Sequence, residues 1–176
     1  MSNEFEEDFI IDDIFTKKTK KIDGKKKGNR TELQLTKVLS SRFGLAFSRT
    51  VSSGARWSQT NLSEEAKNIF SGDLVVCKGF KYCIESKGGY DSIDINSAFL
   101  NGNKEIDLFL EQVTNDSNRC GRKPMLCWKK TRKPWLVFIH SKELSNFTFE
   151  YLLTYNKWSA IALDHLLKLE DKFFIE

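Results

Sequence analysis

Apolar residues dominate two short stretches near the middle of the chain, residues 73–77 and 80–87. Lys78-Gly79 lies between them, and a glycine at this place favours a tight turn. Short apolar runs bounded by turn residues are typical of strands. The pattern therefore predicts a β-hairpin here, and it predicts two further strands at Pro124–Trp128 and Trp135–His140.

Several other segments place their apolar residues at the spacing of an α-helix. A helix is predicted over Thr31–Phe43, where Gly44 supplies a natural stop. The segment Ala98–Asn115 is expected to be mostly helical despite Gly102. The remaining expected elements are a strand over Leu45–Val51, a helix over Asn61–Phe70, and helical pieces over Phe147–Tyr155 and Trp158–Leu169.

This order of helices and strands predicts an α/β fold with a mixed central β-sheet flanked by helices. The 176 residues suit one domain with a full core and an appendage or two. We expect a charged N-terminal arm over residues 1–29, in which Gly24 and Gly28 act as breakers. A core over residues 30–140 follows, and then a C-terminal helical extension over residues 141–176, packed on the core or at a dimer interface.

The net charge of +4 is modest, but the charged residues are unevenly distributed. Residues 4–13 are acidic, and basic side chains gather in two clusters further along the chain. Two basic clusters around a core are a plausible footprint for a polyanion such as DNA. A solvated surface with a flexible tail explains the same residues about as well. The clusters include Lys25, Lys26, Lys27 and Arg30, and then Lys129, Lys130, Arg132 and Lys133.

Trp128 and Trp135 flank the second basic cluster. Aromatic rings beside lysines can stack on exposed bases, while a position in a strand equally suits a core residue. For Trp135 the core interpretation is favoured. No helix-turn-helix or zinc-finger spacing is evident, so recognition of DNA by its shape is expected.

The four cysteines form no Cys-x-x-Cys pair, and the two histidines add little, so a structural zinc site is not expected. No apolar run is long enough to cross a bilayer, and the acidic start does not resemble a secretory signal. These features predict a protein of a reducing cytoplasm without a membrane partner.

Asp73, Glu85 and Lys87 are charged residues that bound otherwise apolar strands. Because burial of unpaired charge is costly, carboxylates in such a setting generally hold a metal, pair with a cation or perform chemistry. Both acids share a face only if a three-residue loop pairs Asp73 with Glu85. A two-residue turn would pair Asp73 with Ile84 and direct Glu85 away. The functional hypothesis therefore predicts the longer loop or a bulge.

A hard cation fits this set of oxygen ligands, and Mg²⁺ is expected, with Mn²⁺ as a possible substitute. Asp73, Glu85 and the Ser86 backbone carbonyl would hold it, and Glu32 would join directly or through water. Lys87 would hold the attacking water or stabilise the developing negative charge on a phosphodiester. Gln112 could orient a water or a phosphate, although most helical glutamines lie on the surface.

Gly72-Asp73 and Glu85-Ser86-Lys87 together resemble the motif of the PD-(D/E)XK nuclease superfamily. The frame around this motif is similar to that of the archaeal-type Holliday junction resolvases, which some phages also carry, and it covers about residues 26–140. The matching segments are Lys27–Glu32, Arg49–Gly54, Gly121–Leu126 and Trp135–Phe138.

The resemblance implies a restriction-endonuclease-like core with an active site of Glu32, Asp73, Glu85 and Lys87. It also implies a serine of the Ser52-Ser53 loop near this site. Arg30 and Arg49 would contact DNA. A homodimer would cut two opposed strands of a four-way junction. The protein would work in the cytoplasm of a bacterial or archaeal host cell and could be encoded by a phage.

The favoured hypothesis is a Mg²⁺-dependent, structure-selective DNA endonuclease that resolves four-way junctions. A restriction- or repair-type nuclease for ordinary duplex DNA is the second enzyme hypothesis. The third is a DNA-binding protein whose nuclease-like core is inert.

Overall fold

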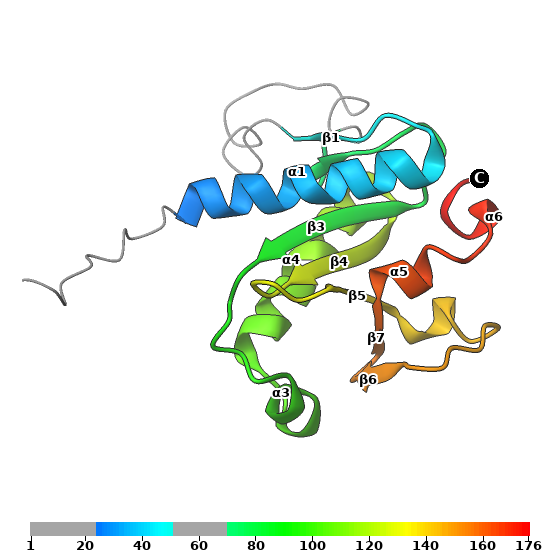
Figure 1. Ribbon diagram of the computed structural model, residues 1–176. Helices are drawn as coiled ribbons and strands as arrows, with labels where there is room; N and C mark the ends of the chain where they lie inside the picture. The colour runs from blue at the N-terminus through cyan, green and yellow to red at the C-terminus, as the bar shows by residue number, and fades with distance from the viewer. Residues whose placement is uncertain (1–23, 51–69) are drawn as a thin grey trace, which may run out of the picture.

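A five-stranded mixed sheet forms the centre of the molecule (Figure 1). The computed structural model describes residues 24–50 and 70–176, and for residues 24–27 only the backbone. The strand order is β3-β4-β5-β7-β6, in which β3 and β4 are parallel and every other neighbouring pair is antiparallel. The strands are β3 (Tyr82–Gly88), β4 (Lys123–Lys129), β5 (Trp135–His140), β6 (Leu153–Tyr155) and β7 (Trp158–Ala162).

Helices cover both faces of the sheet, as an α/β fold requires. On one face, α1 (Gly24–Phe43) packs through Leu35 and Leu39 on Ile84 and the other buried residues of the larger core. On the opposite face, α4 (Lys104–Cys120) packs through a second core (Figure 1). The shorter helices are α3 (Ile95–Asn101), the 3₁₀ helix η1 (Ser141–Glu143), α5 (Leu163–Leu166) and α6 (Asp171–Phe174). The predicted α/β class with a mixed central sheet is confirmed.

A small second sheet lies beside the open edge of β3. Its two antiparallel strands are β1 (Ser48–Arg49) and β2 (Leu74–Val75). The chain turns back after β2 through a tight turn, in which the Phe80 N–H donates to the Cys77 carbonyl at 3.2 Å. The Asp73 N–H donates to the Ile84 carbonyl at 2.9 Å, as a two-residue turn requires. The predicted three-residue loop or bulge is therefore wrong.

Two helix boundaries differ from the predicted ones. Helix α1 begins at Gly24, so Gly24 and Gly28 do not break it, and its first turns contain residues assigned to the N-terminal arm. The predicted helix over Ala98–Asn115 is two helices. Gly102 has a positive φ of 81°, and the Asn103 side chain caps α4 by accepting from the backbone N–H groups of Glu105 and Ile106.

The predicted helix over Phe147–Tyr155 is wrong, and the one over Trp158–Leu169 is confirmed only for α5 (Leu163–Leu166), because β6 and β7 in this tail extend the sheet. Strands β6 and β7 form a hairpin around Asn156, which has a positive φ of 52°. The first four residues of β7 are all buried, because both faces of this strand are covered. A continuous buried run has no alternation, so it does not distinguish a strand from a helix.

Trp128 and Trp135 are both buried, so both belong to the core rather than to a base-stacking surface. The Trp128 indole N–H donates to the Gly89 carbonyl at 3.1 Å. Among the described residues, no helix combines the length and the apolar character needed to span a membrane. The predicted helix over Asn61–Phe70 lies outside the described residues, apart from its last residue.

Candidate active site

Asp73 is held between the end of β1 and the open edge of β3 by three hydrogen bonds. Its N–H donates to the Ile84 carbonyl, and its own carbonyl accepts from the Thr50 N–H at 2.9 Å. Its carboxylate Oδ2 accepts from the buried Ser86 N–H at 2.8 Å. The N–H and C=O of one strand residue point to the same side, so the Ser86 carbonyl also faces this edge. Asp73 therefore lies beside Ser86 although the turn is short.

Gly72 makes this approach possible. Its φ is +80°, a conformation that glycine adopts without strain. A Cβ at this position would lie 2.6 Å from the Ile84 carbonyl oxygen. Only a residue without a side chain brings Asp73 this close to β3.

Glu85 and Lys87 lie on the face of β3 that α4 covers. The Lys87 ammonium donates to Glu85 Oε1 at 2.5 Å and to Gln112 Oε1 at 2.9 Å. It also lies 5.3 Å from the centre of the Phe109 ring, a favourable position for a cation. Lys87 is thus fixed from both the strand and the helix. Gln112 orients this lysine in the structure.

Glu85 is 1% exposed, and its environment disfavours its charge. Burial first, and the Asp73 carboxylate second, raise the pKa of Glu85 to about 8, although Lys87 opposes them. For Lys87, burial is the largest single influence and lowers the pKa, but Glu85, Asp73 and Tyr90 together outweigh it and the net pKa is raised. The two carboxylates of the site therefore repel each other, and one lysine does not neutralise both.

Three residues close to Asp73 carry unpaired polar atoms. Glu85 Oε2, Ser86 Oγ and Thr50 Oγ1 are buried and have no hydrogen-bond partner within the described part of the chain. Buried polar atoms without partners are rare in native proteins and are expected where a ligand or ion completes the site. Oxygen atoms of this kind fit a hard divalent cation.

Glu32 approaches the same site from α1. Arg49 Nε donates to Glu32 Oε2 at 2.6 Å, and Arg49 also donates to Asn29 Oδ1 at 2.6 Å. Burial raises the pKa of Glu32, the hydrogen bond from Arg49 opposes this, and Asp73 adds to the rise. Glu32 is therefore close enough to Asp73 to interact with it, but its nearest charged partner is Arg49. In the structure, the Arg49 guanidinium is therefore occupied by its hydrogen bonds to Glu32 and Asn29.

Among the residues that the structure describes, no three His, Cys, Asp or Glu side chains form a cluster suited to a metal ion. The Asp73 carboxylate and the Ser86 carbonyl face the edge of β3, and the unpaired Glu85 Oε2 lies on the neighbouring face that α4 covers. This set suits a cation that keeps several water ligands, as Mg²⁺ does.

The predicted DNA contacts have varied surroundings. Arg30 and Arg132 are exposed. The Lys129 ammonium lies 3.5 Å from Gln34 Oε1 and 5.4 Å from the centre of the Trp135 ring, and Lys130 donates to the Ile93 carbonyl at 2.5 Å. Lys130 is thus used to hold a loop. The side chains of Lys25, Lys26 and Lys27, and all of Ser52 and Ser53, lie outside the described residues.

Sequence reasoning missed Asp116 and Thr50. Asp116 lies one helical turn beyond Gln112 on α4, so helical spacing from Gln112 could have indicated it. Burial raises the pKa of Asp116, the Arg119 guanidinium at 3.0 Å opposes this, and Asp73 adds to the rise. Thr50 lies within the matching segment Arg49–Gly54, but nothing in the sequence singles it out, because its position depends on how β1 pairs with β2.

The geometry is that of a carboxylate-rich site with a fixed lysine at the edge of a mixed sheet. Residues 23–171 match a family model described as "Phage putative PDDEXK endonuclease". Because this match covers most of the chain, the protein belongs to that family of nucleases. It is a phosphodiester hydrolase that acts on DNA.

Two further proteins are similar to this chain. Protein D14 of Escherichia phage T5 is 29% identical over 126 residues, which cover 69% of this chain and 74% of that protein. The Holliday junction resolvase Hjc of Archaeoglobus fulgidus, an archaeal hyperthermophile, has 19% sequence identity and a TM-score of 0.42. That comparison covers 82% of this chain and 99% of the resolvase chain. The class of protein is identified by the family match. Neither of these two similarities is used to identify it.

Proposed function

We propose that this nuclease is a Mg²⁺-dependent endonuclease whose catalytic centre is formed by Asp73, Glu85 and Lys87, with Mn²⁺ as a possible substitute for Mg²⁺. The observation that supports it most is the buried Glu85 Oε2, which has no hydrogen-bond partner in the described part of the chain and lies near a second carboxylate. A buried carboxylate oxygen without a partner is costly unless a cation or a proton satisfies it.

Asp73, Glu85 and the Ser86 carbonyl would hold the cation, with Glu32 near enough to act through water. When bound, a divalent ion acidifies a water molecule and neutralises charge on the phosphate. The protein supplies the remaining chemistry through its own side chains. The Lys87 ammonium donates hydrogen bonds to the attacking water or to the developing negative charge.

Gln112 and Glu85 keep the Lys87 ammonium in one position before substrate binds, which limits the reorganisation needed during the reaction. The apolar ring of Phe109 beside Lys87 lowers the local exposure to water. In this arrangement Gln112 is a positioning residue for Lys87.

Four-way junctions are the proposed substrate, and a homodimer is the proposed assembly. The support is the resemblance of residues 26–140 to archaeal-type Holliday junction resolvases in motif order. Exposed Arg30 and Arg132 are available for phosphates. Ser52, Ser53 and Lys25–Lys27 belong to this proposed surface on the sequence alone.

Cleavage of a synthetic four-way junction and of a matched linear duplex, each with and without Mg²⁺, tests the proposal. Cutting of the junction alone, and only with Mg²⁺, is expected. Equal cutting of both substrates would favour a restriction- or repair-type nuclease. Binding without metal-dependent cleavage would favour an inert DNA-binding protein.

A further inference from the structure

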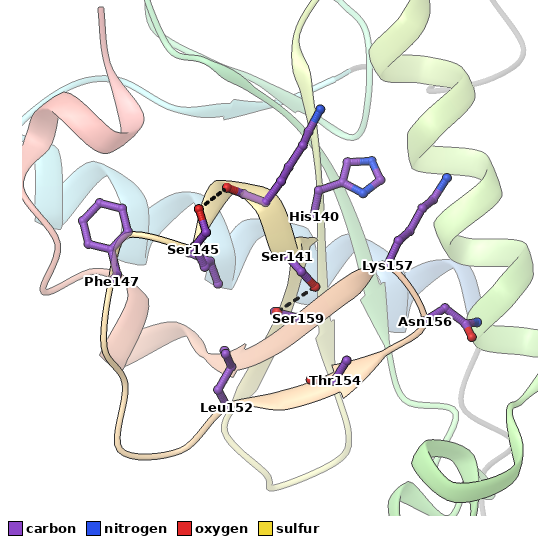
Figure 2. Close-up of a pocket in the computed structure, with 11 residues that line it drawn as sticks. His140, Ser141, Ser145, Phe147, Leu152, Thr154, Asn156, Lys157 and Ser159 are labelled. Carbon is purple, nitrogen blue, oxygen red and sulfur yellow. Dashed lines mark hydrogen bonds between the residues drawn. The ribbon is translucent and has the colours of Figure 1, made fainter.

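A concave site lies away from the catalytic centre, where β5 ends and η1 faces the β6–β7 turn (Figure 2). Its volume is about 850 Å³. Basic, hydroxyl and amide side chains line most of it, three apolar residues complete it, and no acidic residue takes part. The lining residues are His140, Ser141, Lys142, Leu144, Ser145, Phe147, Leu152, Thr154, Asn156, Lys157 and Ser159.

The electrostatics of this cavity favour an anion. Burial first, and the Lys157 and Lys142 charges with it, lower the pKa of His140, while the backbone of Lys157 and the Glu143 carboxylate oppose them. The described residues provide no ion pair or hydrogen bond for the ammonium groups of Lys142 and Lys157. Two unpaired cations therefore flank one imidazole, and no acidic residue in the lining neutralises them.

The polar groups of the cavity are already ordered. His140 stacks on Trp158, with ring centres 4.0 Å apart and an interplanar angle of 23°. The Ser159 hydroxyl donates to Ser141 Oγ at 2.9 Å, and Figure 2 shows His140 and Lys157 extending to the same side. Hydroxyls beside ammonium groups are the donors that commonly bind phosphate oxygens. Such a site needs little rearrangement to accept a phosphate.

We propose that this cavity binds a backbone phosphate of DNA at a second contact, separate from the cleavage centre. The inference rests on the proposed function, because it assumes that the substrate is DNA. Strand β7 lies three strands from β3, which corresponds to about 14 Å at the usual strand spacing. One DNA strand rises about 3.4 Å per nucleotide, so this distance corresponds to about four nucleotides. A DNA strand that crosses the sheet would span this lateral separation within a few nucleotides.

An acidic peptide is the competing ligand, because Phe147 and Leu152 could contact its apolar residues. Phosphate is favoured because the proposed substrate brings backbone phosphates to the protein, and the Ser141 and Thr154 hydroxyls line the cavity as donors.

The test uses the full-length chain without metal, so that no cleavage is required. The NMR signals of the His140 imidazole are followed while a short duplex DNA, inorganic phosphate or an acidic peptide is added. With DNA we expect the His140 signals to shift and its pKa to rise, because a bound anion offsets the Lys142 and Lys157 charges. This readout stays valid if the protein cleaves no junction, so the two proposals can fail separately.

A double variant, Lys142→Glu with Lys157→Glu, supplies the second readout. Its DNA affinity should fall about tenfold at low salt, and the slope of log affinity against log salt should flatten by about 1.8, or 0.9 for each lost contact. Lys104→Glu is the matched control, because Lys104 is exposed and does not line the cavity. This control should bind DNA like the wild type.

Three results would overturn the inference. The first is a DNA titration that leaves the His140 signals unchanged. The second is binding of inorganic phosphate or of the acidic peptide without binding of DNA at His140. The third is a double variant that keeps the wild-type affinity and salt slope.

Discussion

The carboxylate of Asp73 accepts a hydrogen bond from the backbone N–H of Ser86, 2.8 Å away. This bond joins the loop before β2 to the edge of β3, one residue from Glu85. It brings the two acids of the site together although the turn between their strands is a two-residue turn. The side-chain hydrogen bond of Asp73 thus brings it close to Glu85, which strand pairing alone would not do.

Replacement of Gly72 tests whether this approach is needed. Gly72→Ala should destabilise the protein by about 2–4 kcal/mol, because alanine is strained at positive φ and its Cβ would contact the Ile84 carbonyl. Gly44→Ala is the matched control, since Gly44 has φ +63° and nothing within 4 Å of its Cβ position. The control should cost about 1 kcal/mol in urea unfolding. Equal losses in the two variants would show that the contact with Ile84 is unimportant.

The pH dependence of stability follows from Glu85. Its pKa is about 8 in the folded protein, compared with 4.5 for an unperturbed glutamate. The folded state therefore binds this proton more tightly than the unfolded state. The resulting stability is present below the unfolded pKa and is lost as the pH rises through the folded pKa. The free energy of unfolding of the metal-free protein should therefore fall by roughly a few kcal/mol as the pH rises from the unfolded to the folded pKa of Glu85.

Urea unfolding in a chelator, at several pH values, measures this loss for the wild type and for Glu85→Gln. The variant carries no ionisable group at this position, so its stability should change less over the same range. Glu32 and Asp116 also have raised pKa values and contribute to both proteins alike. Identical pH slopes in the two proteins would exclude Glu85 as the cause.

Gln112 should affect the rate of the reaction through Lys87. Gln112→Ala removes the helix-side partner at 2.9 Å and leaves the Glu85 pair intact, so a severalfold lower kcat with little change in KM is expected. Lys87→Ala should lower kcat by at least about 10²-fold, since it removes a charge that acts on the reacting atoms. Glu111→Ala, at an exposed neighbouring position, is the control. A Gln112→Ala enzyme with normal kcat would leave this residue without a positioning role.

The proposed site residues could be picked out from the sequence because their chemistry is visible locally. Asp73, Glu85 and Lys87 stand out as charged residues next to apolar strands, and β4 and β5 were predicted from their turn and apolar runs. The way residues 73–77 lie against residues 80–87 was not predictable. It depends on the positive φ of Gly72 and on the hydrogen bond from the Ser86 N–H to the Asp73 carboxylate.

The C-terminal strands could not be predicted from the sequence for a different reason. The segment from Trp158 to Ile161 is buried on both faces, so the pattern contains no period-2 signal. Its neighbours in the sheet, β5 and β6, decide its conformation, and these contacts are not visible along the sequence. The position of Asp116 likewise depends on how α4 packs on β3.

Binding of Mn²⁺, followed by electron paramagnetic resonance, tests most directly whether Asp73 and Glu85 share one cation. The wild type should bind the ion, and both Asp73→Asn and Glu85→Gln should lose most of this binding while remaining folded. Glu111→Gln, which removes a carboxylate from the exposed side of α4, should bind like the wild type. Retention of wild-type Mn²⁺ affinity in both Asp73→Asn and Glu85→Gln would contradict a shared cation.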